Sequence, residues 1–177
     1  MTKNKSLIFL ILLGSMLVLG SYGVLFQVNP DSMSAKWGGV PEELLPFYQA
    51  NMLWGTAGYF FYTVFFLFIM QEGATGFSPS LENRLLLVFY ALILFPSALW
   101  TPLTLRMVSQ PTSLTWGIIR LVLALVGAGS LGLLFLLLCA WPKKFSLIYL
   151  MAVVGSVGFC LQTVLLDAVI RPSLFMS

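Results

Sequence analysis

The feature that most constrains this chain is an uninterrupted apolar stretch, Leu121 to Ala140, which holds twenty residues and neither a charge nor a proline. At a rise of about 1.5 Å per residue, a helix of this length crosses a hydrocarbon core about 30 Å thick. Its small residues recur at Ala124, Ala128 and Gly132, and Arg120 precedes them at the same spacing. Membrane helices use such small residues to approach one another closely. The sequence therefore predicts a transmembrane helix whose small stripe, together with Arg120, packs on its neighbours.

The composition extends this conclusion to the whole chain of 177 residues. Hydrophobic residues make up 59% and charged residues only 8% of the chain, whereas soluble domains carry about 25% charged residues. The formal charge of +3 is scattered, so no basic run is dense enough to bind nucleic acid or an anionic leaflet on its own. The chain has no histidine, and Cys139 and Cys160 both lie in apolar stretches. Neither a disulfide nor a metal site is therefore expected.

Five apolar stretches together predict an all-α integral membrane protein with a single five-helix domain over residues 1–177. The expected spans are residues 7–26, 47–70, 83–107, 115–140 and 145–170. The first span also has features of a secretory signal, because a basic start precedes it and Ser21-Tyr22-Gly23 matches a cleavage pattern. Its length exceeds the about 7 to 15 apolar residues of such signals, which favours an uncleaved helix. Residues 27–46 are expected to form a long loop that caps one end of the bundle.

Five spans place the two ends of the chain on opposite sides of a membrane, and the basic residues indicate which side is which. Lys3, Lys5, Arg84, Lys143 and Lys144 fall on the side of the N-terminus, and the other four basic residues fall on the opposite side. The first set lies in short segments, where positive charge biases orientation towards the cytoplasm. We therefore expect the N-terminus on the cytoplasmic, or topologically equivalent, side and the C-terminus opposite.

The polar residues inside the spans gather near the end opposite the N-terminus, where Arg120 and Asp167 each lie about one turn inside a helix. An unpaired arginine in hydrocarbon costs about 2.5 to 3.5 kcal/mol, so a partner is expected. We predict an ion pair between Arg120 and Asp167, with Arg171, four residues after the acid, as a competing partner. Such a pair either clamps two helices together, which is the favoured interpretation, or faces a bound ligand.

A second group of residues has the character of a small-molecule pocket, in which aromatic walls surround a few polar groups. Asn51, Gly55 and Gly58 recur at helical spacing and form a small, polar face. This face either packs closely on a neighbouring helix, which is the favoured interpretation, or leaves room for a flat ligand. The candidate ligand-binding residues are Trp37, Asn51, Trp54, Gly58, Tyr59, Ser97, Trp100, Thr104 and Gln162.

This layout resembles that of the translocator protein family, also called tryptophan-rich sensory proteins or peripheral benzodiazepine receptors. The local matches within residues 47–170 are Trp54-Gly55-Thr56 with Gly58-Tyr59, Trp100 with Pro102, and Arg106 ahead of Trp116. Members of that family have five helices and a long first loop that caps a pocket. The resemblance implies a hydrophobic pocket for tetrapyrroles, sterols or similar lipids, and a homodimer.

The favoured function is a non-enzymatic membrane protein that binds or carries a hydrophobic small molecule, such as a tetrapyrrole, pigment, sterol or other lipid, beneath the first loop. The first alternative is a structural or accessory subunit of a larger membrane complex, because the phenylalanine-rich second span could pack on other proteins. The second alternative is a small transporter, which the lack of an internal repeat disfavours. An enzyme is not expected, since no nucleophile–base set or clustered carboxylates are present. Expected partners are the bilayer, the small molecule, and a second copy or other membrane subunits.

Overall fold

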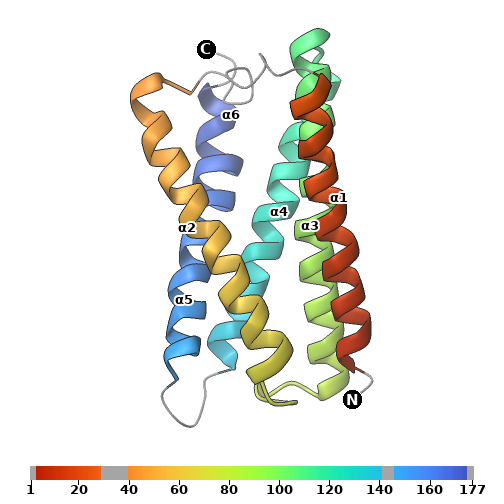
Figure 1. The fold of residues 1–177 in the computed structure, drawn as a ribbon, viewed down its shortest axis with the longest axis vertical. Helices are drawn as coiled ribbons and strands as arrows, with labels where there is room; N and C mark the ends of the chain where they lie inside the picture. Colours follow the sequence, from red (N-terminus) through yellow and green to blue (C-terminus); the bar gives the residue numbers. More distant parts are fainter. Residues whose placement is uncertain (1–2, 29–39, 141–145, 175–177) are drawn as a thin grey trace.

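The computed structural model describes residues 3–28, 40–140 and 146–174, and all regular structure within these ranges is helical (Figure 1). The α-helices are α1 (Lys3–Val28), α2 (Leu45–Val64), α3 (Pro79–Ser109), α4 (Ser113–Cys139), α5 (Leu147–Cys160) and α6 (Arg171–Leu174). A 3-10 turn, η3 (Glu42–Leu44), precedes α2. Two π-helical segments, η4 (Phe65–Ile69) and η5 (Leu161–Ile170), extend α2 and α5.

Five of these helical stretches are long and apolar enough to cross a membrane, which confirms the number of spans expected from the sequence. They cover residues 5–24, 42–69, 79–109, 113–139 and 147–173. Side-chain caps fix where three of them begin. The hydroxyls of Ser78, Thr112 and Ser146 each accept a hydrogen bond from a backbone N–H in the first turn of α3, α4 and α5, respectively.

The helices pack in an order that differs from their order in the chain. Helix α1 packs along α3, α3 along α4, and α4 along both α5 and η5, while α2 packs on α5. The starts of α1, α3 and α5 lie at the lower end of the bundle in Figure 1, and the starts of α2 and α4 lie at the upper end. We use "lower end" and "upper end" in this sense below.

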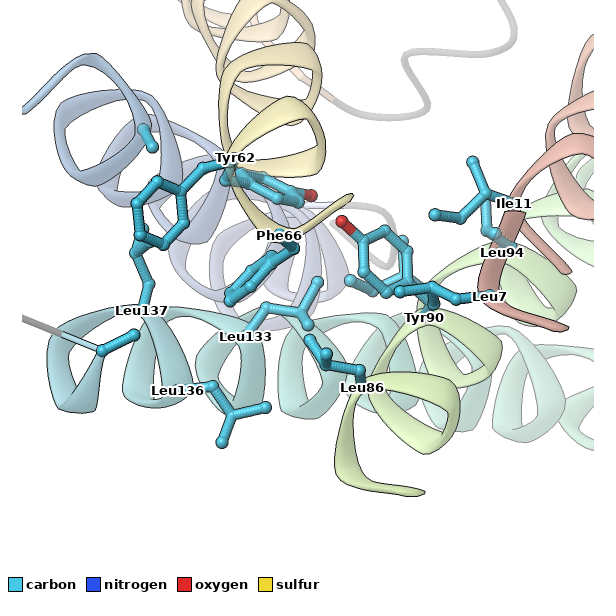
Figure 2. Packing of buried hydrophobic residues seen from close by; sticks show 14 of the residues in the cluster. Leu7, Ile11, Tyr62, Phe66, Leu86, Tyr90, Leu94, Leu133, Leu136 and Leu137 are labelled. Atoms are coloured by element: carbon cyan, nitrogen blue, oxygen red, sulfur yellow. The ribbon is translucent and has the colours of Figure 1, made fainter. Parts of the chain in front are cut away.

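The largest hydrophobic cluster fills the lower half of the bundle. Tyr62 and Tyr90 are almost fully buried in it, and Phe66 lies beside Leu133 (Figure 2). The hydroxyl groups of the two tyrosines point toward each other in this view, and that of Tyr90 lies 2.9 Å from the hydroxyl of Thr63. The Tyr62 ring also lies 5.8 Å from that of Phe159 in α5, so aromatic packing joins α2, α3 and α5 in this half of the bundle.

Helices α2 and α5 come into backbone contact where Gly58 faces Gly155. A Cβ atom built on Gly58 would lie only 2.5 Å from the Cα atom of Gly155. One turn away, a Cβ atom on Gly158 would lie 2.8 Å from the ring of Trp54. The small face of the second span therefore packs closely on a neighbour, as favoured above. The alternative interpretation, that Gly58 leaves room for a flat ligand, is wrong because the backbone of α5 occupies that space.

Most of the small stripe predicted for α4 does not face the bundle, although its last member, Gly132, packs against the ring of Phe89 in α3. Arg120, Ala124 and Ala128 are all exposed. The buried face instead carries a mixture of bulky and small side chains. The bulky ones include Ile119, Leu123, Val126, Leu133 and Leu137, and the small ones are Gly127, Gly129 and Ser130. A Cβ atom on Gly129 would lie 2.8 Å from the carbonyl oxygen of Phe89 in α3. The backbone contact of α4 is thus made by Gly129, and large side chains fill the remaining space between α3 and α5.

Candidate functional site

A continuous chain of polar side chains runs through the upper half of the bundle. The Nδ2 atom of Asn51 in α2 donates to the Oε1 atom of Gln162 in η5 over 3.0 Å. The Nε2 atom of Gln162 donates in turn to Oδ2 of Asp167 over 3.1 Å, and Oδ1 of Asp167 lies 3.1 Å from an Nη atom of Arg171. We refer to these four residues, Asn51, Gln162, Asp167 and Arg171, as the polar chain.

Every member of the polar chain is largely withdrawn from the surface. Asn51, Gln162 and Arg171 expose 8% or less of their area, and the side chain of Asp167 exposes 17%. Buried amides and charges of this kind are tolerated when each finds a hydrogen-bonding partner. The polar chain supplies such partners in series. Its inner end is the neutral amide pair of Asn51 and Gln162, and its outer end is the ion pair of Asp167 and Arg171.

The π-helical segment η5 explains how Gln162 and Asp167 meet. The two residues are five positions apart, a separation that puts side chains on different faces of an α-helix. In a π-helix the backbone hydrogen bonds join residues five apart, so both side chains lie on one side of the segment. The backbone N–H of Arg171 continues this pattern by donating to the carbonyl of Leu166.

Aromatic side chains surround the outer end of the polar chain. The guanidinium of Arg171 lies 5.1 Å from the centre of the Trp100 ring in α3. The Trp100 ring lies 6.2 Å from that of Tyr22 in α1. A cation this close to an indole face is attracted by the ring's quadrupole. Segments from α1, α3 and the end of the fifth span therefore converge on Arg171.

The predicted ion pair between Arg120 and Asp167 is wrong, and the competing partner holds the acid. Asp167 pairs with Arg171, one turn further along the same segment, while the Arg120 side chain is exposed on α4. The pairing follows from the orientation of α4, which presents Ile119 and Leu123 to the bundle and turns Arg120 outward. A long arginine near a helix start can extend its charge toward the boundary without a partner in the bundle.

The structure distributes the predicted ligand-binding residues among several environments. Asn51, Trp100 and Gln162 come together at the upper end, as described above. Thr104 is buried, and its hydroxyl donates to the carbonyl oxygen of Trp100, while Ser97 is half-buried one turn before that tryptophan. These positions agree with one polar region late in α3.

The remaining predicted residues do not join this region. Tyr59 belongs to the aromatic cluster around Tyr62, with ring centres 5.4 Å apart, and Gly58 lies at the α2–α5 contact. Trp54 is 46% exposed and covers Gly158 from outside. Trp37 lies outside the described residues.

Three further groups support the region and were not among the predicted site residues. The hydroxyl of Tyr48 donates to the carbonyl oxygen of Leu166 over 3.3 Å, and the hydroxyls of Ser130 and Thr163 lie 2.7 Å apart between α4 and η5. Tyr22 is the third. A tyrosine in the otherwise apolar first span was the available signal for Tyr22, because a buried phenol usually finds a polar neighbour.

The groups at the upper end are suited to binding and not to bond-making chemistry. They are the guanidinium of Arg171, the carboxylate of Asp167, the amides of Asn51 and Gln162, and the indole of Trp100. Within the described residues, no group of three or more His, Cys, Asp or Glu side chains could hold a metal ion. No protein-family model, curated protein or solved structure matches the chain.

Proposed function

We propose that this chain is a multi-pass integral membrane protein that binds or carries a hydrophobic small molecule with a polar group. The polar group would dock at the upper end, against Arg171, Asp167 and Trp100, and the apolar part would extend between the helices. The N-terminus, and with it the lower end, would face the cytoplasm or its topological equivalent, as the short basic segments favour.

The observation that carries the proposal is the ion pair between Asp167 and Arg171. A charged group within a membrane is costly, so an ionisable residue there is a functional candidate. The helix clamp favoured from the sequence required partners on two different helices. Asp167 and Arg171 are four residues apart on one continuous segment, so their pairing joins no two helices.

The surroundings of the pair favour a ligand of mixed polarity. Trp100 provides an aromatic wall, and Gln162 connects the acid to the amide of Asn51. A few fixed polar groups among apolar and aromatic walls are typical of small-molecule sites in helix bundles. A tetrapyrrole, a sterol or another lipid with one polar end has this combination, in agreement with the family resemblance described above.

The proposal is tested by purifying the protein from membranes into lipid nanodiscs and titrating protoporphyrin IX while tryptophan fluorescence is recorded. We expect saturable quenching for the wild type, and binding at least tenfold weaker for Arg171→Gln, because a charge-assisted hydrogen bond contributes about 1.5 to 3 kcal/mol. Trp100→Phe keeps an aromatic ring and should weaken binding less. Arg120→Gln removes the same charge from an exposed position and should bind as the wild type does.

Two results would contradict the proposal. If Arg171→Gln and Arg120→Gln bound protoporphyrin IX equally well, the binding site would not be at the upper end. Absence of saturable quenching, together with organic extracts of the purified protein that contain no stoichiometric pigment or lipid, would exclude the function. A protein partner recovered at fixed stoichiometry in that second case would favour the accessory subunit.

A further inference from the structure

A shallow apolar groove lies on the outer side of the contact between α1 and α3, in the half of these helices nearest the lower end. It is open to the outside and has a volume of about 450 Å³. Leu10 and Leu87 form its base, because both are partly buried against the main hydrophobic cluster. Phe9, Leu13 and Phe95 line it as well and are between 40% and 68% exposed, which makes them its walls.

The register of the two helices shows what lies at the lower end of this groove. A Cβ atom on Gly14 would contact Leu94, and the hydroxyl of Ser21 lies 3.5 Å from that of Thr101. Both pairs are 80 residues apart, so α1 and α3 run parallel with a constant offset. The same offset places Arg84 beside residue 4 and therefore at the height of Lys5.

Lys5 and Arg84 share the face of the groove as well as its height. Lys5 precedes the lining residue Phe9 by four positions, and Arg84 precedes the lining residue Val88 by four. Residues four apart lie on one face of a helix, so each basic side chain stands one turn below a wall of the groove. Both are exposed.

The acids that the structure describes at this end, Glu72 and Glu82, do not hold Lys5 or Arg84 in an ion pair. Neither Lys5 nor Arg84 forms an ion pair within residues 3–28, 40–140 and 146–174. The nearest acid in the sequence, Glu82, is buried and turned away, since its carboxylate accepts hydrogen bonds from Gly73 and Thr75. The N-termini of α1 and α3 also lie at this end, and their dipoles favour a negative group.

We propose that this groove binds one anionic phospholipid, with an acyl chain against Leu10, Leu87 and Ala91 and the phosphate between Lys5 and Arg84. An acyl chain matches the apolar lining, and a phosphate matches two exposed cations at one end of it. Neither feature is sufficient by itself, because two basic residues are too few to hold an anionic leaflet and an apolar face alone suits any lipid. The proposal rests on the membrane location proposed above, but not on the ligand of the upper end.

The test is native mass spectrometry of the protein in detergent micelles, titrated with dioleoylphosphatidylglycerol or dioleoylphosphatidylcholine. We expect the first lipid to bind about thirty-fold more tightly, from two basic contacts at about 1 kcal/mol each. Lys5→Gln/Arg84→Gln changes two exposed side chains and should erase the difference between the lipids. Ala91→Phe fills the groove and should weaken both lipids. Arg120→Gln is the matched control, since it removes a charge from an exposed face of α4 and should change neither affinity.

The outcomes separate the alternatives. Phosphatidylcholine carries a phosphate as well, but its choline group cancels the negative charge. Equal affinity for the two lipids in the wild type, or a difference that survives Lys5→Gln/Arg84→Gln, would therefore overturn the selection of an anionic headgroup by Lys5 and Arg84. Affinities for both lipids that are unchanged by Ala91→Phe would overturn the groove, since only surface charge would then be acting. A dimer whose formation Ala91→Phe abolishes would show that a second copy, and not a lipid, covers the groove. If the protein were not a membrane protein, it would be recovered in the soluble fraction before any lipid is added, and this result would be distinguishable from a failure of lipid binding.

Discussion

The contact between Gly58 and Gly155 gives the sharpest test of how this bundle is held together. An ordinary van der Waals contact of a Cβ atom begins near 3.4 Å, whereas a Cβ atom on Gly58 would lie 2.5 Å from the Cα atom of Gly155. The obstacle is backbone and cannot rotate away. Gly58→Ala therefore forces α2 and α5 apart by about 1 Å, the difference between these two distances.

The energetic consequence of Gly58→Ala follows from three contributions. Overpacking of a close contact costs about 1 to 3 kcal/mol. The hydrogen bond between Asn51 and Gln162 joins α2 to η5, which continues α5, and a 1 Å separation would stretch its 3.0 Å toward 4 Å, at a cost of about 1 kcal/mol. Alanine's better helix propensity offsets about 1 kcal/mol. We expect a net loss of about 1 to 3 kcal/mol in the free energy of unfolding.

The assay for Gly58→Ala is reversible unfolding in mixed detergent and dodecyl sulfate micelles, followed by circular dichroism. Gly117→Ala is the control, because a Cβ atom on Gly117 in α4 meets nothing within 4 Å and should stabilise the protein by up to about 1 kcal/mol. Gly58→Ala/Gly155→Ala should cost less than the sum of the single variants, since one separation accommodates both methyl groups. A Gly58→Ala protein as stable as Gly117→Ala would refute the reasoning.

Two further predictions concern the lower end and the orientation. The buried carboxylate of Glu82 accepts hydrogen bonds from the hydroxyl and the N–H of Thr75, so Glu82→Ala should lower the free energy of unfolding by about 3 kcal/mol and expose the segment between α2 and α3 to protease. Glu82→Gln should lose less stability. Equal protease resistance of the wild type and both variants would contradict this prediction. In a cysteine-free background expressed in whole cells, Ser113→Cys should react with an impermeant maleimide in intact cells and Ser80→Cys only after permeabilisation. The reverse pattern would invert the proposed orientation.

The existence of the five helices follows from the sequence because it depends on length and hydropathy alone. An uncharged stretch such as Leu121–Ala140 has one stable solution in lipid, a helix that satisfies its own backbone. Caps such as Ser78 refine the boundaries by a few residues. Neither property requires knowledge of which helices are neighbours.

The face that each helix turns inward could be predicted only in part. In α2 the small residues lie on one face, so the contact through Gly58 follows from the pattern. In α4, small residues occur on two faces, at Ala124 and Ala128 and at Gly127 and Gly129. Spacing alone cannot decide between them. The choice is made by packing against Phe89 of α3, which is remote in sequence.

The path of the polar chain could not be predicted because it depends on a change of helix type. A repeat of 3.6 residues places Arg171 near Asp167, and that contact was anticipated as the competing one. The same repeat places Gln162 elsewhere, since five residues make more than one turn of an α-helix. Only the wider π-helical geometry of η5 brings Gln162 to Asp167.

The wide segment and the polar chain depend on each other. A π-helix is rare because its backbone is less favourable than that of an α-helix, so a ten-residue segment needs compensation. The bond from Gln162 to Asp167 supplies part of it and would be lost in an α-helix, where the two side chains would lie on different faces. Asp167 would then keep only Arg171. The bond from Gln162 that helps to make the buried ion pair tolerable is therefore also a bond that only the wide geometry of η5 permits.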